Sequence, residues 1–189
     1  GYTETFGNKE LRYEISKTYD TAKPEHILCF AGAEEGIYVA MRVILSHNDH
    51  AIIVVPNYQA AETIPLDICE VSGVPLNPEE NWTLDIDRVK NEIRPNTKLI
   101  SINFPNNPTG AILSRERLDE LIRICRSRGL YLFSDEVYRL LERDTQLRLP
   151  QIADIYERGL SLNVMSKAYG LPGLRLGWIM CKDKTILQN

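Results

Sequence analysis

Short, continuously apolar runs alternate with amphipathic stretches along almost the whole chain. The runs AIIVV at 51–55, KLISIN at 98–103, LYLFSD at 130–135 and GLSLNVMS at 159–166 indicate strands that are buried on both faces. Between them, RERLDELIRICRSR at 115–128 has apolar residues at helical spacing and is followed by Gly129. Strands buried on both faces need helices on both sides, so the sequence predicts an α/β fold with a mainly parallel sheet.

The same alternation predicts the remaining elements and the domain organisation. Further helices are expected at 10–19, 33–45, 58–66 and 84–93, and further strands at 26–32, 67–76 and 175–181. The last residues, CKDKTILQN, indicate a strand end that enters a new helix. A length of 189 residues fits one domain. Because the chain starts at Gly1 and stops inside a helix pattern, we expect it to be a portion of a longer protein.

Composition disfavours several classes of partner. The formal net charge is −4, with 22 basic and 26 acidic residues, so no basic field is expected to hold a nucleic acid. No apolar run approaches the roughly 20 residues that cross a bilayer, and the polar start GYTETFGNKE is unlike a secretory signal. We therefore expect a cytoplasmic protein without a membrane partner, in which this segment does not bind nucleic acid directly.

The cysteines and histidines show no metal-ligand spacing, and we expect no metal site. Four cysteines are far apart, mostly inside apolar runs, and are interpreted as structural: Cys29, Cys69, Cys125 and Cys181. Three histidines are assigned no function, with the last two placed in a polar loop: His26, His47 and His50.

Three polar motifs follow predicted strands, where functional groups gather in α/β sheets. NFPNNPTG at 103–110 is a loop fixed by prolines, which could aim an amide or be an ordinary turn. SDEVY at 134–138 puts Asp135 where a carboxylate needs a cation or an N–H donor, although for this motif taken alone a helix N-cap is the favoured interpretation. MSKAYGLPGLRLGW at 165–178 puts Lys167 after a buried strand, where a partly desolvated lysine is a candidate for Schiff-base chemistry rather than an ordinary surface lysine.

These three motifs, in this order on an α/β pattern, resemble the class I and II aminotransferases and relatives with the same pyridoxal 5′-phosphate (PLP) fold. The resemblance implies a three-layer α/β/α domain. It also implies that residues 1–189 are an incomplete PLP-binding large domain, without its N-terminal arm and its C-terminal small domain. Lys167 would then form the aldimine with the cofactor and act as the base, and Asp135 would pair with the pyridine nitrogen. Tyr138, expected one helical turn after Asp135, and Asn107 would bond the ring 3′ oxygen.

The resemblance also assigns the rest of the cofactor site. The phosphate would be held by the Arg175 guanidinium, the Ser166 hydroxyl and the amides of a helix start, Gly32, Ala33 and Glu34, with the Glu34 carboxylate turned away. Tyr58 would stack on the ring, although a half-buried aromatic at a helix start is a serious alternative. Val164 departs from the family, which often has Ser or Thr there. AGAEEG lacks the second glycine of a dinucleotide fingerprint, so NAD is disfavoured.

On this basis we expect a PLP-dependent aminotransferase that moves an amino group from an L-amino acid to a 2-oxo acid. The resemblance further implies a homodimer in which Tyr2 reaches the phosphate site of the partner subunit. A carbon-sulfur β-lyase and the PLP-sensing domain of a transcription regulator remain alternatives. The arginine that binds the substrate carboxylate in this family is expected to lie outside the chain.

Overall fold

One sheet forms the centre of the molecule. The computed structural model describes residues 2–188, and within them the strand order is β1-β7-β6-β5-β4-β2-β3. The strands are β1 Ile27–Phe30, β2 His50–Val55, β3 Glu70–Pro75, β4 Thr97–Asn103, β5 Tyr131–Asp135, β6 Gly159–Val164 and β7 Gly177–Cys181. Neighbouring strands from β3 to β6 are parallel, whereas β7 is antiparallel to both β6 and β1. The predicted mainly parallel sheet is confirmed.

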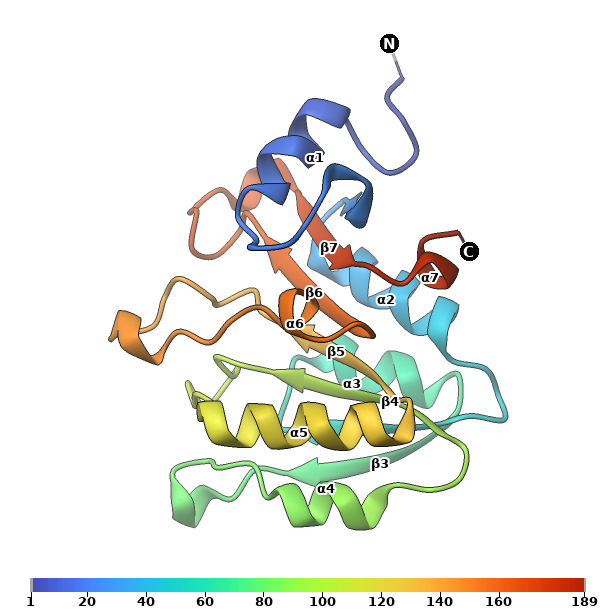
Figure 1. Cartoon of the computed structure of the whole chain (residues 1–189). Coiled ribbons are helices and arrows are strands. Elements are labelled where there is room, and N and C mark those ends of the chain that lie inside the picture. Colours follow the sequence, from blue (N-terminus) through green and yellow to red (C-terminus); the bar gives the residue numbers. More distant parts are fainter. Residues whose placement is uncertain (1, 189) are drawn as a thin grey trace.

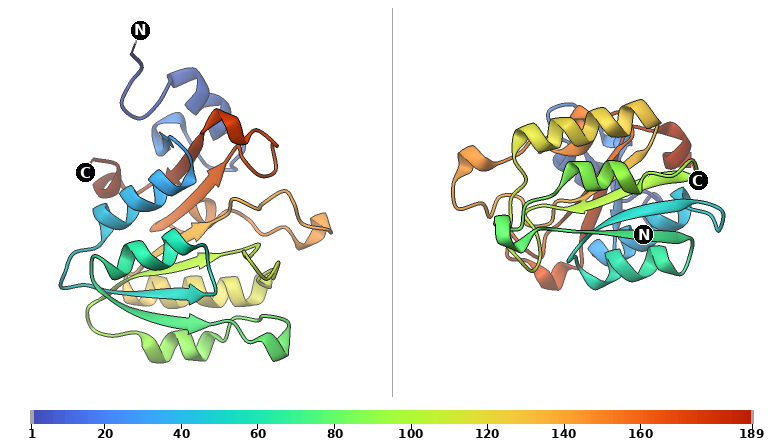
Figure 2. Two further views of the ribbon diagram at one scale, coloured as in Figure 1. Left: turned by 180° about the vertical axis from the view of Figure 1, so that it is seen from behind. Right: turned by 90° about the horizontal axis from the view of Figure 1, so that it is seen from below.

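Helices cover both faces of this sheet, as predicted. They are α1 Lys9–Ser16, α2 Ala33–Ile44, α3 Gln59–Leu66, α4 Ile86–Glu92, α5 Arg115–Arg128, α6 Ile152–Ile155 and α7 Lys184–Gln188. The right-hand view of Figure 2 shows the strands between α4 and α5 on one side and α2 and α3 on the other. Alternate residues of each strand face the two layers: Ile100 and Leu132 belong to the α4/α5 core, and Leu99 and Phe133 to the α2/α3 core.

A third, smaller core lies at the β1 edge, where α1 packs. It contains Ile15 of α1 together with Trp178 and Met180 of β7. The four cysteines are free, and Cys125 and Cys181 are buried in the two main cores, as expected of structural thiols. Among residues 2–188, no helix combines the length and the apolar character that crossing a bilayer requires.

The observed elements differ from the predicted ones mainly at their ends. The strand expected from residue 67 begins at Glu70, because the amides of Asp67, Ile68 and Cys69 still donate to carbonyls of the last turn of α3. The segment 136–151 contains only turns and a 3-10 helix at Thr145–Leu147, and the short α6 that follows was not predicted. Neither has enough apolar residues at regular spacing to give a periodic signal.

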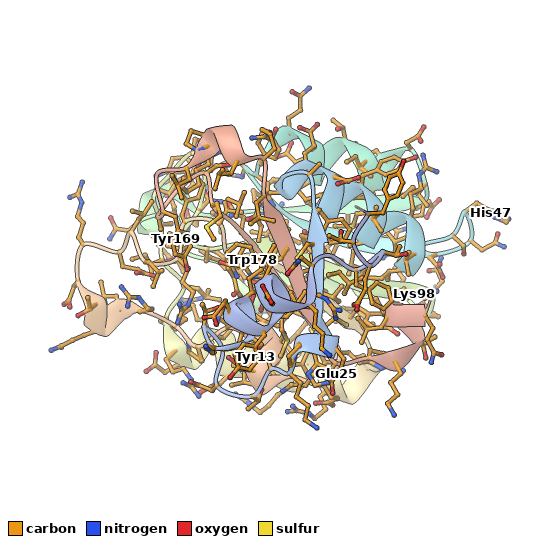
Figure 3. All side chains as sticks on the ribbon, turned by 90° about the horizontal axis from the view of Figure 1, so that it is seen from above. Tyr13, Glu25, His47, Lys98, Tyr169 and Trp178 are labelled. Atoms are coloured by element: carbon orange, nitrogen blue, oxygen red, sulfur yellow. The ribbon has the colours of Figure 1, made fainter. Side chains whose placement is uncertain are left out.

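The expected polar loop at 47–50 is wrong for His50. His47 is exposed at the tip of a loop and points away from the body (Figure 3), but His50 is the first residue of β2 and is fully buried. Its ring nitrogens lie 2.7 Å from Thr97 Oγ1 and 3.0 Å from Ser72 Oγ. Hydroxyl groups on the two neighbouring strands thus satisfy a buried imidazole, and burial lowers the pKa of His50.

The carboxyl ends of the parallel strands meet at one edge of the sheet. The loops that follow β4, β5 and β6 leave the sheet on the same side in Figure 1, and each begins with one of the three polar motifs. Because the strands are parallel, motifs separated by about 30 residues in the chain become neighbours in space.

Gly159, the first residue of β6, packs directly against α6. A Cβ at Gly159 would lie 2.6 Å from Ile152 Cγ2 and 2.8 Å from the Ile152 carbonyl oxygen. We therefore expect Gly159→Ala to lower the free energy of unfolding by about 1–3 kcal/mol in urea titrations. Gly73→Ala in β3 is the matched control, because its Cβ would meet only Val55 methyl groups at 3.7 and 4.0 Å. Equal stability of the two variants would contradict the tight packing of β6 on α6.

Candidate active site

A cavity of about 280 Å³ lies at the carboxyl edge of the sheet. It is lined by all the predicted site residues except Gly32 and Tyr2, namely Ala33, Glu34, Tyr58, Asn107, Asp135, Tyr138, Ser166, Lys167 and Arg175. Val164, the position that departs from the family, also lines it and is buried. The fold therefore brings together side chains from six separate segments, in a space close to the size range of small-ligand pockets.

Lys167 lies in the turn after β6, and backbone hydrogen bonds fix this turn. The Met165 amide donates to the Leu176 carbonyl at 2.9 Å and the Gly170 amide donates to the Lys167 carbonyl at 3.0 Å. The ring of Tyr169 contacts that of Trp178, with 6.3 Å between centroids, and Figure 3 shows both side chains. The main chain at Lys167 is thus anchored to β7.

The side chain of Lys167 is exposed, so the expectation of a partly desolvated lysine is wrong for this chain. Its Nζ lies 5.2 Å from the centroid of the Tyr138 ring, within the range of a cation–π contact. β6 ends at Val164, two residues earlier than predicted, and Lys167 lies in the turn that follows.

Asp135 is the buried acid of the cavity. It ends β5, is 3% exposed, and its Oδ1 accepts a hydrogen bond from the Val137 amide at 3.1 Å. Burial raises the pKa of Asp135 to about 6, although the Val137 N–H and the positive charge of Lys167 oppose the rise. A cation inside the cavity would stabilise the ionised form of this carboxylate.

The helix N-cap alternative for Asp135 is wrong, because residues 137–140 form turns rather than a helix. The expectation that Tyr138 lies one helical turn beyond Asp135 is therefore wrong. The turn nevertheless directs Tyr138 to the same cavity as Asp135. The backbone after β5 doubles back at once, with the Arg139 amide donating to the Glu136 carbonyl at 2.9 Å.

Two asparagines that the sequence reasoning did not single out organise the NFPNNPTG loop. Asn103, at the end of β4, donates from Nδ2 to the Asp135 carbonyl at 3.0 Å and accepts at Oδ1 from the Asn107 amide at 2.7 Å. Asn106 donates to the Pro56 carbonyl and accepts from the Thr109 hydroxyl. Asn107 is thus held at the cavity wall. Asn103 could have been found from its place at a strand end, as Asp135 was.

The part of the cavity formed by α2 and Arg175 has the features of an anion site. α2 starts here with Gly32 as its N-cap, at φ 103°, and Ala33 and Glu34 form its first turn. A Cβ on Gly32 would lie 2.6 Å from Arg175 Nη2, and a Cβ on Gly177 would lie 2.7 Å from the Gly32 carbonyl carbon. Glycine at both positions lets β7, the start of α2 and the Arg175 guanidinium approach closely, which places a cation beside the positive end of a helix dipole.

Tyr58 and Glu34 face each other across this end. The Tyr58 hydroxyl donates to Glu34 Oε2 at 3.2 Å, so the Glu34 carboxylate is directed at Tyr58 and lines the cavity. Whether this carboxylate also turns away from a bound phosphate stays a prediction. Tyr2 is fully exposed before α1 and is not among the described residues that line the cavity of its own chain.

Glu136 is a second buried acid, which the sequence reasoning did not use. Strand alternation turns it to the face opposite Asp135, where its Oε1 accepts from the Ile152 amide and the Ser161 hydroxyl, both at 2.9 Å. It thereby joins the end of β5 to α6 and β6. Burial raises the pKa of Glu136 to about 7, against the effect of those donors and of the Arg139 charge.

Among the described residues 2–188, no cluster of three or more His, Cys, Asp or Glu side chains could hold a metal ion. The side chains that line the cavity provide an amine, a buried carboxylate, a guanidinium, amides and hydroxyls. These groups are suited to an anionic ligand that carries a carbonyl and a basic nitrogen.

Comparison with known families agrees with this arrangement. The sequence profile of the family described as aminotransferase class I and II matches residues 1–189. The chain belongs to this family. Family membership implies pyridoxal phosphate as the cofactor.

Individual aminotransferases are similar over nearly the whole chain. The aspartate aminotransferase of Pyrococcus horikoshii is 31% identical over 98% of this chain and 49% of its own length. The arginine–pyruvate transaminase of Pseudomonas aeruginosa is 30% identical over 95% of this chain and 47% of its own length. The crystal structure of a PLP-dependent aminotransferase from Streptococcus suis superimposes with a TM-score of 0.93 at 35% identity, covering 100% of this chain and 50% of that one. The chain spans about half the length of the relatives it matches.

The raised pKa of Glu136 gives a pH-dependent stability. The folded state binds the Glu136 proton more tightly than the unfolded state, whose pKa is near 4.5, so this contribution is full below pH 4.5 and is lost as pH rises through 7. We expect wild type to lose roughly 3 kcal/mol relative to Glu136→Gln between pH 4.5 and 8, at about 1.4 kcal/mol per pKa unit. Urea titrations at each pH measure the difference.

Glu80→Gln removes a carboxylate from an exposed position and is the control for the substitution itself, measured at the same pH values. Asp135 titrates in all three proteins, so its contribution cancels when their free energies of unfolding are compared. A stability difference between wild type and Glu136→Gln that does not change with pH would show that Glu136 keeps an ordinary pKa in the folded protein.

Proposed function

We propose that this chain is the PLP-binding domain of an aminotransferase that transfers an amino group from an L-amino acid to a 2-oxo acid. The observation that carries the proposal is the convergence of Lys167, Asp135 and Arg175 on one cavity, from three different segments. The names of the relatives, which include aspartate, arginine–pyruvate and kynurenine–oxoglutarate transaminases, support transamination over the lyase and regulator alternatives.

The residues of the cavity fit PLP group by group. The buried Asp135 carboxylate, which burial disfavours as an anion, would hold the protonated pyridine nitrogen. Arg175, Ser166 and the first amides of α2 would hold the phosphate, because they combine a guanidinium, a hydroxyl and a helix N-terminus. Asn107 and Tyr138 would bond the ring oxygen, and Tyr58 would cover the ring.

When bound, PLP supplies an aldehyde for covalent capture of amines and an electron sink for the charge left on the substrate α-carbon. Lys167 would anchor the cofactor and, once its amine is free, carry the proton removed from that carbon. Asp135 would keep a proton on the ring nitrogen, because an anion fixed in a buried wall stabilises a cation beside it. Asn103 and Asn107 would orient the ring through the hydrogen-bonded loop after β4.

The choice of amino acid is a separate question from the chemistry. This chain provides cofactor-binding groups, and the side chain that binds the substrate carboxylate is expected outside it. A cytoplasmic location stays a prediction from composition.

Lys167 is the sharpest test of the proposed function. We expect Lys167→Ala to abolish covalent attachment of PLP, because no other described lysine lines the cavity, and to lower transamination at least a thousandfold. Borohydride reduction followed by mass spectrometry measures the attachment, and keto acid release measures turnover. Lys182→Ala is the control, since Lys182 donates to the Asp154 carbonyl outside the cavity. Full labelling of the Lys167→Ala protein would contradict the assignment.

We also propose that the protein is a homodimer in which Tyr2 completes the phosphate site of the partner subunit. In support, Tyr2 is fully exposed on its own chain, and the cavity it would serve has Val164 where a hydroxyl could have contributed. A tyrosine hydroxyl from the partner subunit would offset that missing donor.

Subunit complementation tests the role of Tyr2. When Tyr2→Phe and Lys167→Ala chains are mixed and allowed to exchange, a mixed dimer carries one site with both defects and one with neither. The activity should therefore exceed the sum of the two parents assayed separately at the same amounts. If Tyr2 serves its own subunit or has no role, exchange will leave that sum unchanged. Sedimentation velocity of the wild-type protein should show a dimer.

A further inference from the structure

The contact between Glu34 and Tyr58 joins two parts of the cavity that have different tasks. Glu34 lies in the first turn of α2, next to the proposed phosphate site, and Tyr58 precedes α3, next to the proposed ring site. Glu34 Oε2 is the one hydrogen-bond partner found for the Tyr58 hydroxyl among the described residues. Tyr58 is 41% exposed, so packing alone holds its ring weakly.

A carboxylate at this place opposes the binding of an anion. The positive end of α2 and the Arg175 guanidinium attract phosphate, whereas the Glu34 charge repels it. Glu34 forms no ion pair within residues 2–188, so its charge is not neutralised by a bound cation of the chain. The neighbouring Glu35 differs, because its carboxylate accepts from the Ala31 amide on the other side of the helix start. The positive end of α2 favours an acid in its first turn, but a charge at position 34 works against an anionic ligand at the same helix end.

We propose that Glu34 is a positioning residue whose carboxylate holds the Tyr58 hydroxyl and thereby fixes the Tyr58 ring at the cavity. This inference rests on the proposed function, since it assumes a phosphorylated pyridine ring as the ligand. Glu34 then has two opposed effects on that ligand. Its charge weakens the binding of the phosphate, and its hydrogen bond strengthens the binding of the ring.

The two effects separate when two probes are compared. Inorganic phosphate reports only on the phosphate site. Pyridoxine 5′-phosphate carries the ring and the phosphate but has no aldehyde, so it binds without covalent attachment to Lys167. Calorimetric titration of the cofactor-free protein gives the dissociation constants of both probes for wild type, Glu34→Gln, Glu34→Ala, Tyr58→Phe and the Glu34→Ala/Tyr58→Phe double variant.

Glutamine keeps an acceptor oxygen for the Tyr58 hydroxyl but loses the charge. Glu34→Gln should therefore lower the dissociation constants of both probes by a similar factor. Alanine loses both the acceptor and the charge. Glu34→Ala should therefore bind phosphate as tightly as Glu34→Gln does. It should bind pyridoxine 5′-phosphate about threefold to tenfold more weakly than Glu34→Gln, the range expected for one hydrogen bond. In the Tyr58→Phe background, Glu34→Ala should change both probes equally, because no hydroxyl remains to be held.

Glu35→Gln is the matched control, since it removes a charge from the same helix end without touching Tyr58 and should affect both probes by the same factor. Far-UV circular dichroism and thermal unfolding confirm that each variant is folded. If Glu34→Ala changes the two probes equally in the Tyr58 background as well, Glu34 acts by charge alone and the inference is wrong. A wild-type protein that retains PLP on Lys167 would still support the proposed function in that case, whereas absence of PLP attachment would overturn both.

Discussion

Burial of the sheet on both faces is the constraint on which the rest of this molecule depends. Strands β2, β4, β5 and β6 are buried along almost their whole length because helices cover both sides, so ionisable groups are largely excluded from the middle of the sheet. Polar side chains can act only where the strands end. The parallel direction of these strands then collects the ends at one edge, and that is where Asp135, Asn107 and Lys167 meet.

The end of β5 illustrates how strand geometry divides two adjacent acids between two tasks. Asp135 and Glu136 are both buried, with exposures of 3% and 5%, yet alternation turns them to opposite faces. Asp135 lines the open cavity, where a cationic ligand can reach it. Glu136 faces α6 and β6, where an amide and a hydroxyl hold it. One carboxylate is available for chemistry and the other fixes the backbone that carries it.

Much of the fold and the membership of the cavity could be predicted from sequence because both follow from periodic or local signals. The predicted bounds of the helix at 115–128 agree with those of α5, because Ser114 and Gly129 cap it. The errors lie where the outcome depends on contacts distant in sequence. The burial of His50 depends on hydroxyls of Thr97 and Ser72, and the turn at 137–140 packs against the α2/α3 core through Val137. Lys167 is exposed in the turn after β6, and no local pattern specifies that this strand ends at Val164.

Burial in the cavity is uneven, and this unevenness bears on how the site is completed. Asp135 is buried at the end of β5, whereas Lys167, Tyr58 and Arg175 are exposed. Charge-dependent chemistry gains strength when water is excluded, because the effective dielectric constant falls. Because these exposed groups line the same cavity, a second protein surface over it would cover them together. A partner subunit that contributes Tyr2 would supply such a surface, so the proposed homodimer also accounts for desolvation that this chain alone does not provide.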